Sequence, residues 1–365
     1  MNKSKTSNYT RIIAFFLVAV TLLCIFGFAA EGWQPDQNES DSGKIDNSSD
    51  ETDDNKENES QLPEIHIPEF LNSITGLETT EELSRSKTTC FIMDATAPLY
   101  GISGSDMIIE VPIESGNTRL AVLTANSKAL GKIGSISKTR GYISNLAKYF
   151  GAILISTGYD DTVEYDSVDI STSHFDLSTN VGYHYTEYTH FTYTNGALIN
   201  AGLSNANIGT VSAKNPTLPY VFTDFGGDHI RGTLQARSVV FHYSDKSESS
   251  LFYSDTDKKY VLSKNGTVKT DMLTDSAVCF DNAFVLFADS ITYENAESSE
   301  LILNTGTQGT GYYFTQGTAK SITWETDISG NMKFYDEAGN TLVINRGSLY
   351  IGIMKSSMKD TLSFS

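Results

Sequence analysis

The sequence predicts an α+β fold, in which a mixed α/β domain precedes a β-rich domain behind a membrane anchor and a disordered acidic stalk. An uncharged run near the N-terminus is followed by a strongly acidic segment. A strand–helix–strand pattern occupies the middle of the chain, and short apolar runs separated by turn signals fill the C-terminal third. We therefore expect four parts, at residues 1–30, 31–64, 65–225 and 226–356.

The first part is apolar enough to cross a membrane. Residues 12–30 carry no charge and follow Lys3, Lys5 and Arg11. As a helix of 1.5 Å per residue, this run would span roughly 28 Å, close to the thickness of one hydrocarbon core. Basic residues before the run favour a cytoplasmic N-terminus and an exported remainder. The alternative is a signal peptide, because residues 27–29 (GFA) form a small-x-small cleavage pattern. The chain is thus expected at the cell membrane as a single-pass protein, or secreted if cleaved.

The second part is too acidic and too poor in apolar residues to form a core. Residues 31–60 contain eleven Asp or Glu and two Lys, a net charge of −9 out of −19 for the whole chain. Such a segment cannot bury enough surface to offset its loss of conformational entropy, so it is predicted to be a disordered spacer. The overall acidity also argues against nucleic-acid binding, which needs a basic surface.

Residues 105–123 (SDMIIEVPIESGNTRLAVL) place three charged residues in an apolar stretch. Gly116-Asn117 predicts a two-residue hairpin turn that pairs Glu114 with Arg119. Glu110, Glu114 and Arg119 would then share the surface face, away from the apolar residues. We expect an ion pair between the last two. A pair of catalytic carboxylates is disfavoured, because residues four apart on a strand lie about 13 Å apart, against about 5–9.5 Å in glycosidases.

The two expected domains differ in their hydrophobic periodicity. Tyr142, Ile143, Leu146, Ala147 and Phe150 recur at helical spacing, and a buried strand is predicted at 152–157 after Gly151. From residue 237 onwards, short strand-like runs alternate with turns: SVVFHYS, AFVLFADSIT, SITWETD, KFYD, TLVINR and LYIGIM. The boundary is expected near 215–235, which contains Gly, Pro and Asp.

Motifs of known chemistry are absent or incomplete. Residues 135–138 (SISK) fit S-x-x-K without a downstream K-T-G, and G-x-S-x-G does not occur. The six histidines show neither H-E-x-x-H nor zinc-finger spacing. No catalytic residue, metal or cofactor is therefore predicted. Cys90 and Cys279 are either two free thiols or one disulfide, and the sequence leaves both possibilities open.

Several segments together resemble the YerB-like family of Gram-positive lipoproteins, whose two adjoining domains have no established function. The resemblance covers about 70–355 and is carried by NSITGL (72–77), 90–123, KIGSISKTR (132–140), HFTYT (190–194), 301–325 and INRGSLYIGI (344–353). The chain departs from the family pattern at Ser137, where an arginine is usual, and at STGYD (156–160). A lipobox is missing, because Leu23 precedes Cys24.

The resemblance implies a polar set that would form an anion or glycan pocket. Its members in this chain are Glu110, Glu114, Arg119, Arg140 and His190. We expect a membrane-tethered extracytoplasmic binding or scaffold protein of the cell envelope, whose partner is an envelope component or envelope protein. The alternative is a cell-wall glycan hydrolase or transferase that uses Glu110 or Glu114 with Arg119, Arg140 and His190. This alternative requires these groups to converge in one cleft. A purely structural role in envelope assembly is a third possibility.

Overall fold

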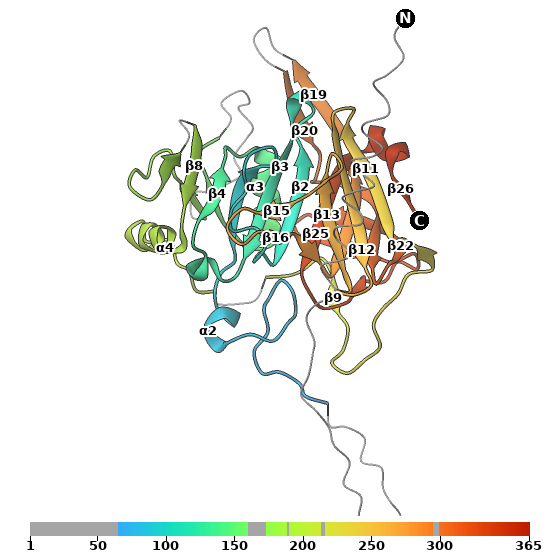
Figure 1. The fold of residues 1–365 in the computed structure, drawn as a ribbon. Coiled ribbons are helices and arrows are strands. Elements are labelled where there is room, and N and C mark those ends of the chain that lie inside the picture. Colours follow the sequence, from blue (N-terminus) through green and yellow to red (C-terminus); the bar gives the residue numbers. More distant parts are fainter. Residues whose placement is uncertain (1–64, 160–172, 188–189, 213–215, 295–298) are drawn as a thin grey trace, which may run out of the picture. The chain divides into compact units, whose positions relative to one another are not determined.

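The computed structural model describes residues 65–159, 173–187, 190–212, 216–294 and 299–365 (Figure 1). The predicted anchor and stalk, residues 1–64, lie outside these described residues. Among the helices that the structure describes, none combines the length and the apolar composition needed to cross a membrane.

The described part of the chain is mostly β-sheet, with a few short helices. The helix expected around residues 142–150 is present as α3, and the strand expected after it is β5, Ile153–Ser156. The helices and 3₁₀ turns are α2 (Glu81–Ser84), η1 (Glu114–Gly116), η2 (Ser127–Ala129), α3 (Gly141–Tyr149), α4 (Gly196–Asn205) and η3 (Ser356–Thr361). The mainly β composition agrees with the abundance of β-branched and aromatic residues in the sequence.

Within the described residues, fourteen strands form one long sheet that contains strands from both expected domains. Its path is β10 (Leu234–Gln235), β22 (Thr318–Thr326), β21 (Gln308–Thr315), β18 (Asn282–Ala288), β25 (Leu349–Lys355), β2 (Met107–Pro112), β3 (Thr118–Thr124), β1 (Thr89–Asp94), β4 (Ile133–Ile136), β8 (Phe191–Thr194) and β7 (Tyr185–Glu187). Beside this path, β23 (Met332–Tyr335) pairs with β22, β5 pairs with β1, and β6 (His174–Asp176) pairs with β5.

A second sheet of six described strands lies against the half of the long sheet that contains β25 (Figure 1). Its strands are β14 (Thr267–Val268), β13 (Lys259–Lys264), β12 (Ser247–Ser254), β11 (Ser238–Ser244), β26 (Ser363–Phe364) and, beside β13, β17 (Cys279–Phe280). Three further pairs are β15 (Thr270–Asp271) with β16 (Ser276–Ala277), β19 (Ser290–Glu294) with β20 (Ser299–Leu303), and β9 (Val221–Phe222) with β24 (Val343–Ile344).

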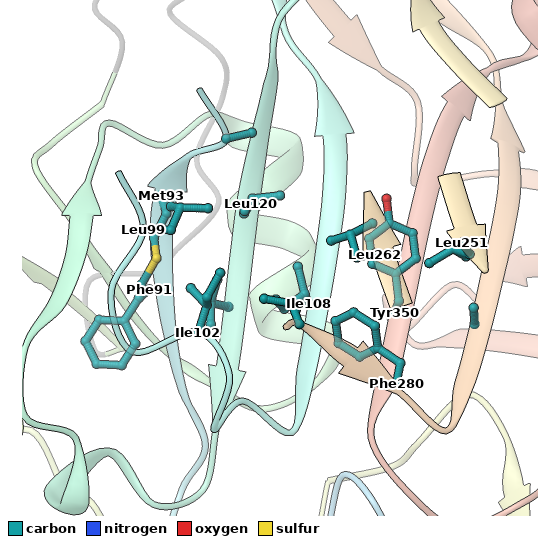
Figure 2. Packing of buried hydrophobic residues seen from close by; sticks show 14 of the residues in the cluster. Phe91, Met93, Leu99, Ile102, Ile108, Leu120, Leu251, Leu262, Phe280 and Tyr350 are labelled. Carbon is teal, nitrogen blue, oxygen red and sulfur yellow. The ribbon is translucent and has the colours of Figure 1, made fainter. Parts of the chain in front are cut away.

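Both faces of the long sheet are buried at its centre. Alternate residues of β2 point to opposite faces, so Ile108 joins one core and Ile109 the other. Figure 2 shows Ile108 between Leu120 on one side and Leu262, Phe280 and Tyr350 on the other. Part of this first core lies between the two sheets, and it extends to Ile199 and Leu203 of α4. The second core lies on the opposite face and includes the apolar side of α3.

The hairpin of β2 and β3 is real, but the predicted register is wrong. Val111 lies opposite Arg119 and Pro112 opposite Thr118, so the chain turns through the longer η1 turn, where Ser115 has a φ of 64°. The predicted register paired residue 114 with residue 119, whereas the observed register pairs residue 111 with residue 119. The two strands are thus shifted by three residues relative to the prediction. An odd shift of this kind exchanges the two faces of β3.

Candidate functional site

Glu110 is a buried charged residue at the centre of the molecule, and the prediction that it lies on a surface face is wrong. Its side chain is 2% exposed. One carboxylate oxygen accepts hydrogen bonds from Thr118 Oγ1 at 2.6 Å and from Lys264 Nζ at 2.5 Å. The other accepts from Ser249 Oγ at 2.9 Å and from Tyr350 OH at 2.6 Å. Four donors from β3, β12, β13 and β25 thus converge on one carboxylate of β2.

This arrangement keeps Glu110 ionised. Burial alone would raise the pKa of its carboxyl group, but the charge of Lys264 and the hydrogen bonds from Lys264, Thr118 and Tyr350 more than offset burial and lower the pKa. Conversely, burial followed by the charge of Glu110 raises the pKa of Tyr350 well above its usual value. The tyrosine therefore stays a hydrogen-bond donor, and a single negative charge occupies this site.

The lowered pKa of Glu110 predicts a specific loss of stability in acid. The unfolded chain takes up this proton near the usual value of 4.5, whereas the folded chain takes it up only at lower pH. The contribution of Glu110 to stability is therefore complete above about pH 5 and lost as the pH falls through the folded pKa. In urea unfolding between pH 3 and 7, the difference between wild type and Glu110→Gln should shrink below about pH 4.5. A difference that stays constant across this range would contradict the prediction.

The predicted ion pair between Glu114 and Arg119 is also wrong. Arg119 Nη1 donates to Asp94 Oδ2 at 2.8 Å, because residue 119 lies opposite residue 94 across β1 and β3. Glu114 instead accepts a hydrogen bond from Nη2 of Arg140, which precedes α3 as its N-cap residue. The observed register places Arg119 on the face of Ala121, in the core beside α3, whereas Glu110 faces the second sheet.

The five residues of the predicted polar set therefore do not form one site. Glu114 and Arg140 are brought together, whereas Glu110 and Arg119 lie on opposite faces of the sheet, each with another partner. His190 is exposed, and its ring contacts Phe191 at a centroid distance of 4.2 Å. The convergence that a glycan hydrolase or transferase would require is not observed among these groups.

A double-mutant cycle can test the observed register in solution. Arg119→Ala, Asp94→Ala and the double variant should give a coupling energy of about 1 kcal/mol, because both side chains are mostly buried. The corresponding cycle between Arg119 and Glu114 should give a coupling near zero. Chemical denaturation of the six proteins measures both. A coupling energy between Arg119 and Glu114, with none between Arg119 and Asp94, would contradict the observed register and support the predicted two-residue turn.

A cleft of about 390 Å³ adjoins the Glu110 network at Lys264. It is lined by the segment 95–99, which follows β1, and by residues 246–247, 264–265, 267–270 and 272. Lys246, Lys264 and Lys269 line it, and we call it the lysine cleft. Its other lining residues are Ala95, Thr96, Ala97, Pro98, Leu99, Asn117, Ser247, Asn265, Thr267, Val268, Thr270 and Met272.

The lysine cleft is basic although the protein is acidic. Its lining contains three lysines and no Asp or Glu, in a chain with a net charge of −19. Lys264 forms part of the cleft and also binds the buried Glu110, so the cleft and the carboxylate network share this residue. Lys269 Nζ donates to the backbone oxygen of Ala95 at 2.9 Å, which joins two of the segments that line the cleft. Burial lowers the pKa of Lys269.

This arrangement does not place Glu110 for acid–base chemistry. Glu110 has its carboxylate engaged by four donors and lies in the core, so it is not placed to exchange protons with a substrate. Among the described residues, no cluster of His, Cys, Asp or Glu could hold a metal ion. Cys90 and Cys279 are both free thiols, which settles the alternative between two thiols and one disulfide.

Residue patterns gave a signal for Lys264 that the sequence prediction missed. Tyr260, Leu262 and Lys264 alternate along β13, and the Asn265-Gly266 dipeptide after them is a hairpin turn signal. Both turn residues have the positive φ that such a turn requires, 49° and 74°. A lysine on the same face as two core residues needs a partner, and here that partner comes from the other half of the chain.

Comparison with known proteins gives a family match in two parts. Residues 74–209 match the N-terminal domain, and residues 239–351 the C-terminal domain, of a family described as protein of unknown function (DUF3048). Among solved structures, the chain is similar to the YerB protein from Bacillus subtilis, with 18% sequence identity and a TM-score of 0.69. The similarity covers 81% of this chain and 99% of that one. No curated protein matches.

The YerB similarity at this identity concerns the fold alone. The two family matches together span more than half of the chain, and they fall on the segments in which the sequence resembles YerB-like proteins. The resemblance is confirmed, and the chain is a member of the DUF3048 family of two-domain proteins of unknown function.

Proposed function

We propose that this protein is a membrane-tethered, extracytoplasmic binding protein of the Gram-positive cell envelope and that the lysine cleft is its binding site. The observation that carries the binding role is the cleft itself, a basic hollow of about 390 Å³ in a strongly acidic chain. The uncharged run at residues 12–30 and the acidic segment after it support tethering at the membrane. Its expected partner is a component of the envelope.

The structure favours binding over catalysis for a geometric reason. Catalysis needs acid, base or nucleophile positioned within about 0.5 Å of the productive geometry around one substrate. Glu110 and Glu114, the candidate acids, are instead engaged in separate ion pairs, and Arg119 lies in a third. The cleft, by contrast, presents three lysines, two of them held by hydrogen bonds, and several hydroxyl groups, which are sufficient for recognition.

Tethering can be tested on the full-length chain with a C-terminal epitope tag, expressed in a Gram-positive host. We expect the tag in the membrane fraction, and we expect protease added to intact cells to remove it. A tag that is protected in intact cells, or absent from both membrane and medium, would refute the proposed location.

Binding can be tested by sedimentation of the detergent-solubilised protein with purified cell-wall material and, separately, with membranes. The wild type should be retained by one of them. Combined Lys246→Glu and Lys269→Glu replacement should reduce retention about tenfold, because it reverses the charge of the cleft. Lys148→Glu, on the exposed side of α3, is the control and should be retained like the wild type. Equal retention of all three proteins would exclude the cleft as the site.

A further inference from the structure

We propose that the lysine cleft recognises a phosphate group, most naturally a phosphate monoester. This inference deepens the proposed binding function and rests on it. It depends on three features of the described residues: the charge of the cleft, its unused hydrogen-bond donors and the fixed positions of two of its lysines.

The charge of the cleft matches that of a phosphate monoester. Lys246, Lys264 and Lys269 contribute three positive charges, and Glu110 beneath Lys264 contributes one negative charge, which leaves +2. A phosphate monoester carries about −1.5 to −2 at pH 7. No Asp or Glu lines the cleft to repel such a group.

Donors for phosphate oxygens are available at the same place. The Ser247 hydroxyl is buried, since the residue is 5% exposed, and it lacks a hydrogen-bond partner in the described structure. Leaving a buried hydroxyl without a hydrogen bond is unfavourable, so a ligand oxygen that accepts a hydrogen bond from Ser247 would remove this cost. Lys269 uses one of its three donors, for Ala95, and the ammonium group of Lys246 has no partner among the described residues.

Two of the lysines, Lys264 and Lys269, are held in place before any ligand binds. Lys269 is held by its hydrogen bond to Ala95. Lys264 is fixed by Glu110 and by Ser249 Oγ at 3.1 Å, and Glu110 is in turn fixed by Thr118 and Tyr350. Glu110 is thus a positioning residue for the cleft. Because these side chains are already ordered, binding loses less conformational entropy than it would with flexible surface lysines.

The phosphate could belong to a phospholipid or to a soluble phosphate ester, and apolar residues at the edge of the cleft distinguish these two sources. Val268 and Met272 line the cleft and are 46% and 56% exposed. An apolar edge beside a phosphate site could contact the acyl chains of a phospholipid, whereas a soluble phosphate ester would not use it. The shared chemistry is the phosphate, and the two sources differ in the contribution of these two side chains.

Isothermal titration of the detergent-solubilised full-length protein tests the proposal. The ligands are glycerol 3-phosphate, glycerol, glycerate and dihexanoylphosphatidic acid at monomeric concentration. We expect binding of the two phosphates, none of glycerol, and weaker binding of glycerate. Lys269→Gln and Lys246→Gln should each weaken phosphate binding about tenfold, and Ser247→Ala about threefold. Lys148→Gln is the matched control and should bind like the wild type.

Thermal unfolding of each variant shows whether it is folded, and Lys246→Gln, at an exposed position, keeps the test valid if Lys269→Gln is unstable. The proposal is overturned if neither phosphate binds, if glycerate binds equally well, or if the cleft variants bind like wild type. Tighter binding of the phosphatidic acid that is lost in Val268→Ser/Met272→Ser would assign a lipid source. Equal binding of both phosphates would assign a soluble one.

The two proposals fail in different ways. If phosphates do not bind but retention by envelope material still depends on the cleft, the phosphate inference is wrong and the binding function stands. If phosphates bind at the cleft but the protein is retained by neither cell-wall material nor membranes, the envelope function is wrong and the phosphate site stands.

Discussion

Replacing Glu110 with alanine is expected to destabilise the protein by about 3–5 kcal/mol, a large share of the 5–15 kcal/mol that typical proteins possess. The replacement leaves Lys264, whose side chain is 10% exposed, without its counter-charge. It also leaves the hydroxyls of Thr118, Ser249 and Tyr350 without their common acceptor. Urea unfolding at pH 7 measures the loss.

Two comparisons make this result specific to the buried charge. Glu110→Gln combined with Lys264→Met should recover part of the stability that Glu110→Gln alone removes, because no unpaired charge then remains buried. Glu82→Ala removes a carboxylate that binds Lys128 on the surface, where both side chains are mostly exposed, and should have little effect. Equal losses for Glu110→Ala and Glu82→Ala would contradict the buried network.

Replacing Arg140 with alanine should have the second largest effect, a loss of about 2–3 kcal/mol. The Arg140 side chain is 3% exposed and donates to Glu114, which is 27% exposed and has a second buried carboxylate oxygen without a hydrogen-bond partner in the described structure. Without Arg140, this half-buried carboxylate loses its countercharge. The effect should appear in unfolding free energy rather than only in ligand binding, because the pair connects the η1 turn to the start of α3.

Arg85→Ala is the matched control for Arg140→Ala. Arg85 also binds a glutamate, Glu81, at 2.9 Å, but the two side chains are 65% and 56% exposed on the short helix α2. Exposed pairs of this kind contribute at most about 1 kcal/mol. If Arg140→Ala unfolds at the same urea concentration as wild type, the buried pair does not contribute to stability as argued.

Local sequence patterns predicted local structure well. Helical spacing identified α3, and strict alternation in SVVFHYS identified β11, where Val239, Phe241 and Tyr243 are buried. These patterns succeed because the period of a helix or strand depends on neighbouring residues. The two-part family resemblance likewise came from motifs read along the chain.

Long-range contacts were missed for a physical reason. The turn between β2 and β3 looked like a two-residue hairpin, but Glu114–Gly116 form a longer turn, and this reversed the faces assigned to β3. A further signal was present in β2 itself: apolar residues surround Glu110 without alternation, which indicates a strand buried on both faces. The identity of its partner, Lys264, depends on a contact across 154 residues, which no local pattern encodes.

The position of β25 has a consequence for biosynthesis. This strand pairs in parallel with both β2 and β18, yet Tyr350 of β25 follows Glu110 of β2 by 240 residues, so β25 is synthesised long after β2. Until β25 is made, the nascent chain exposes an open edge on β2, whose side chains other than Glu110 are apolar. The growing chain therefore needs protection from aggregation until β25 has been made, and a truncated product that lacks residues 349–365 should aggregate rather than fold.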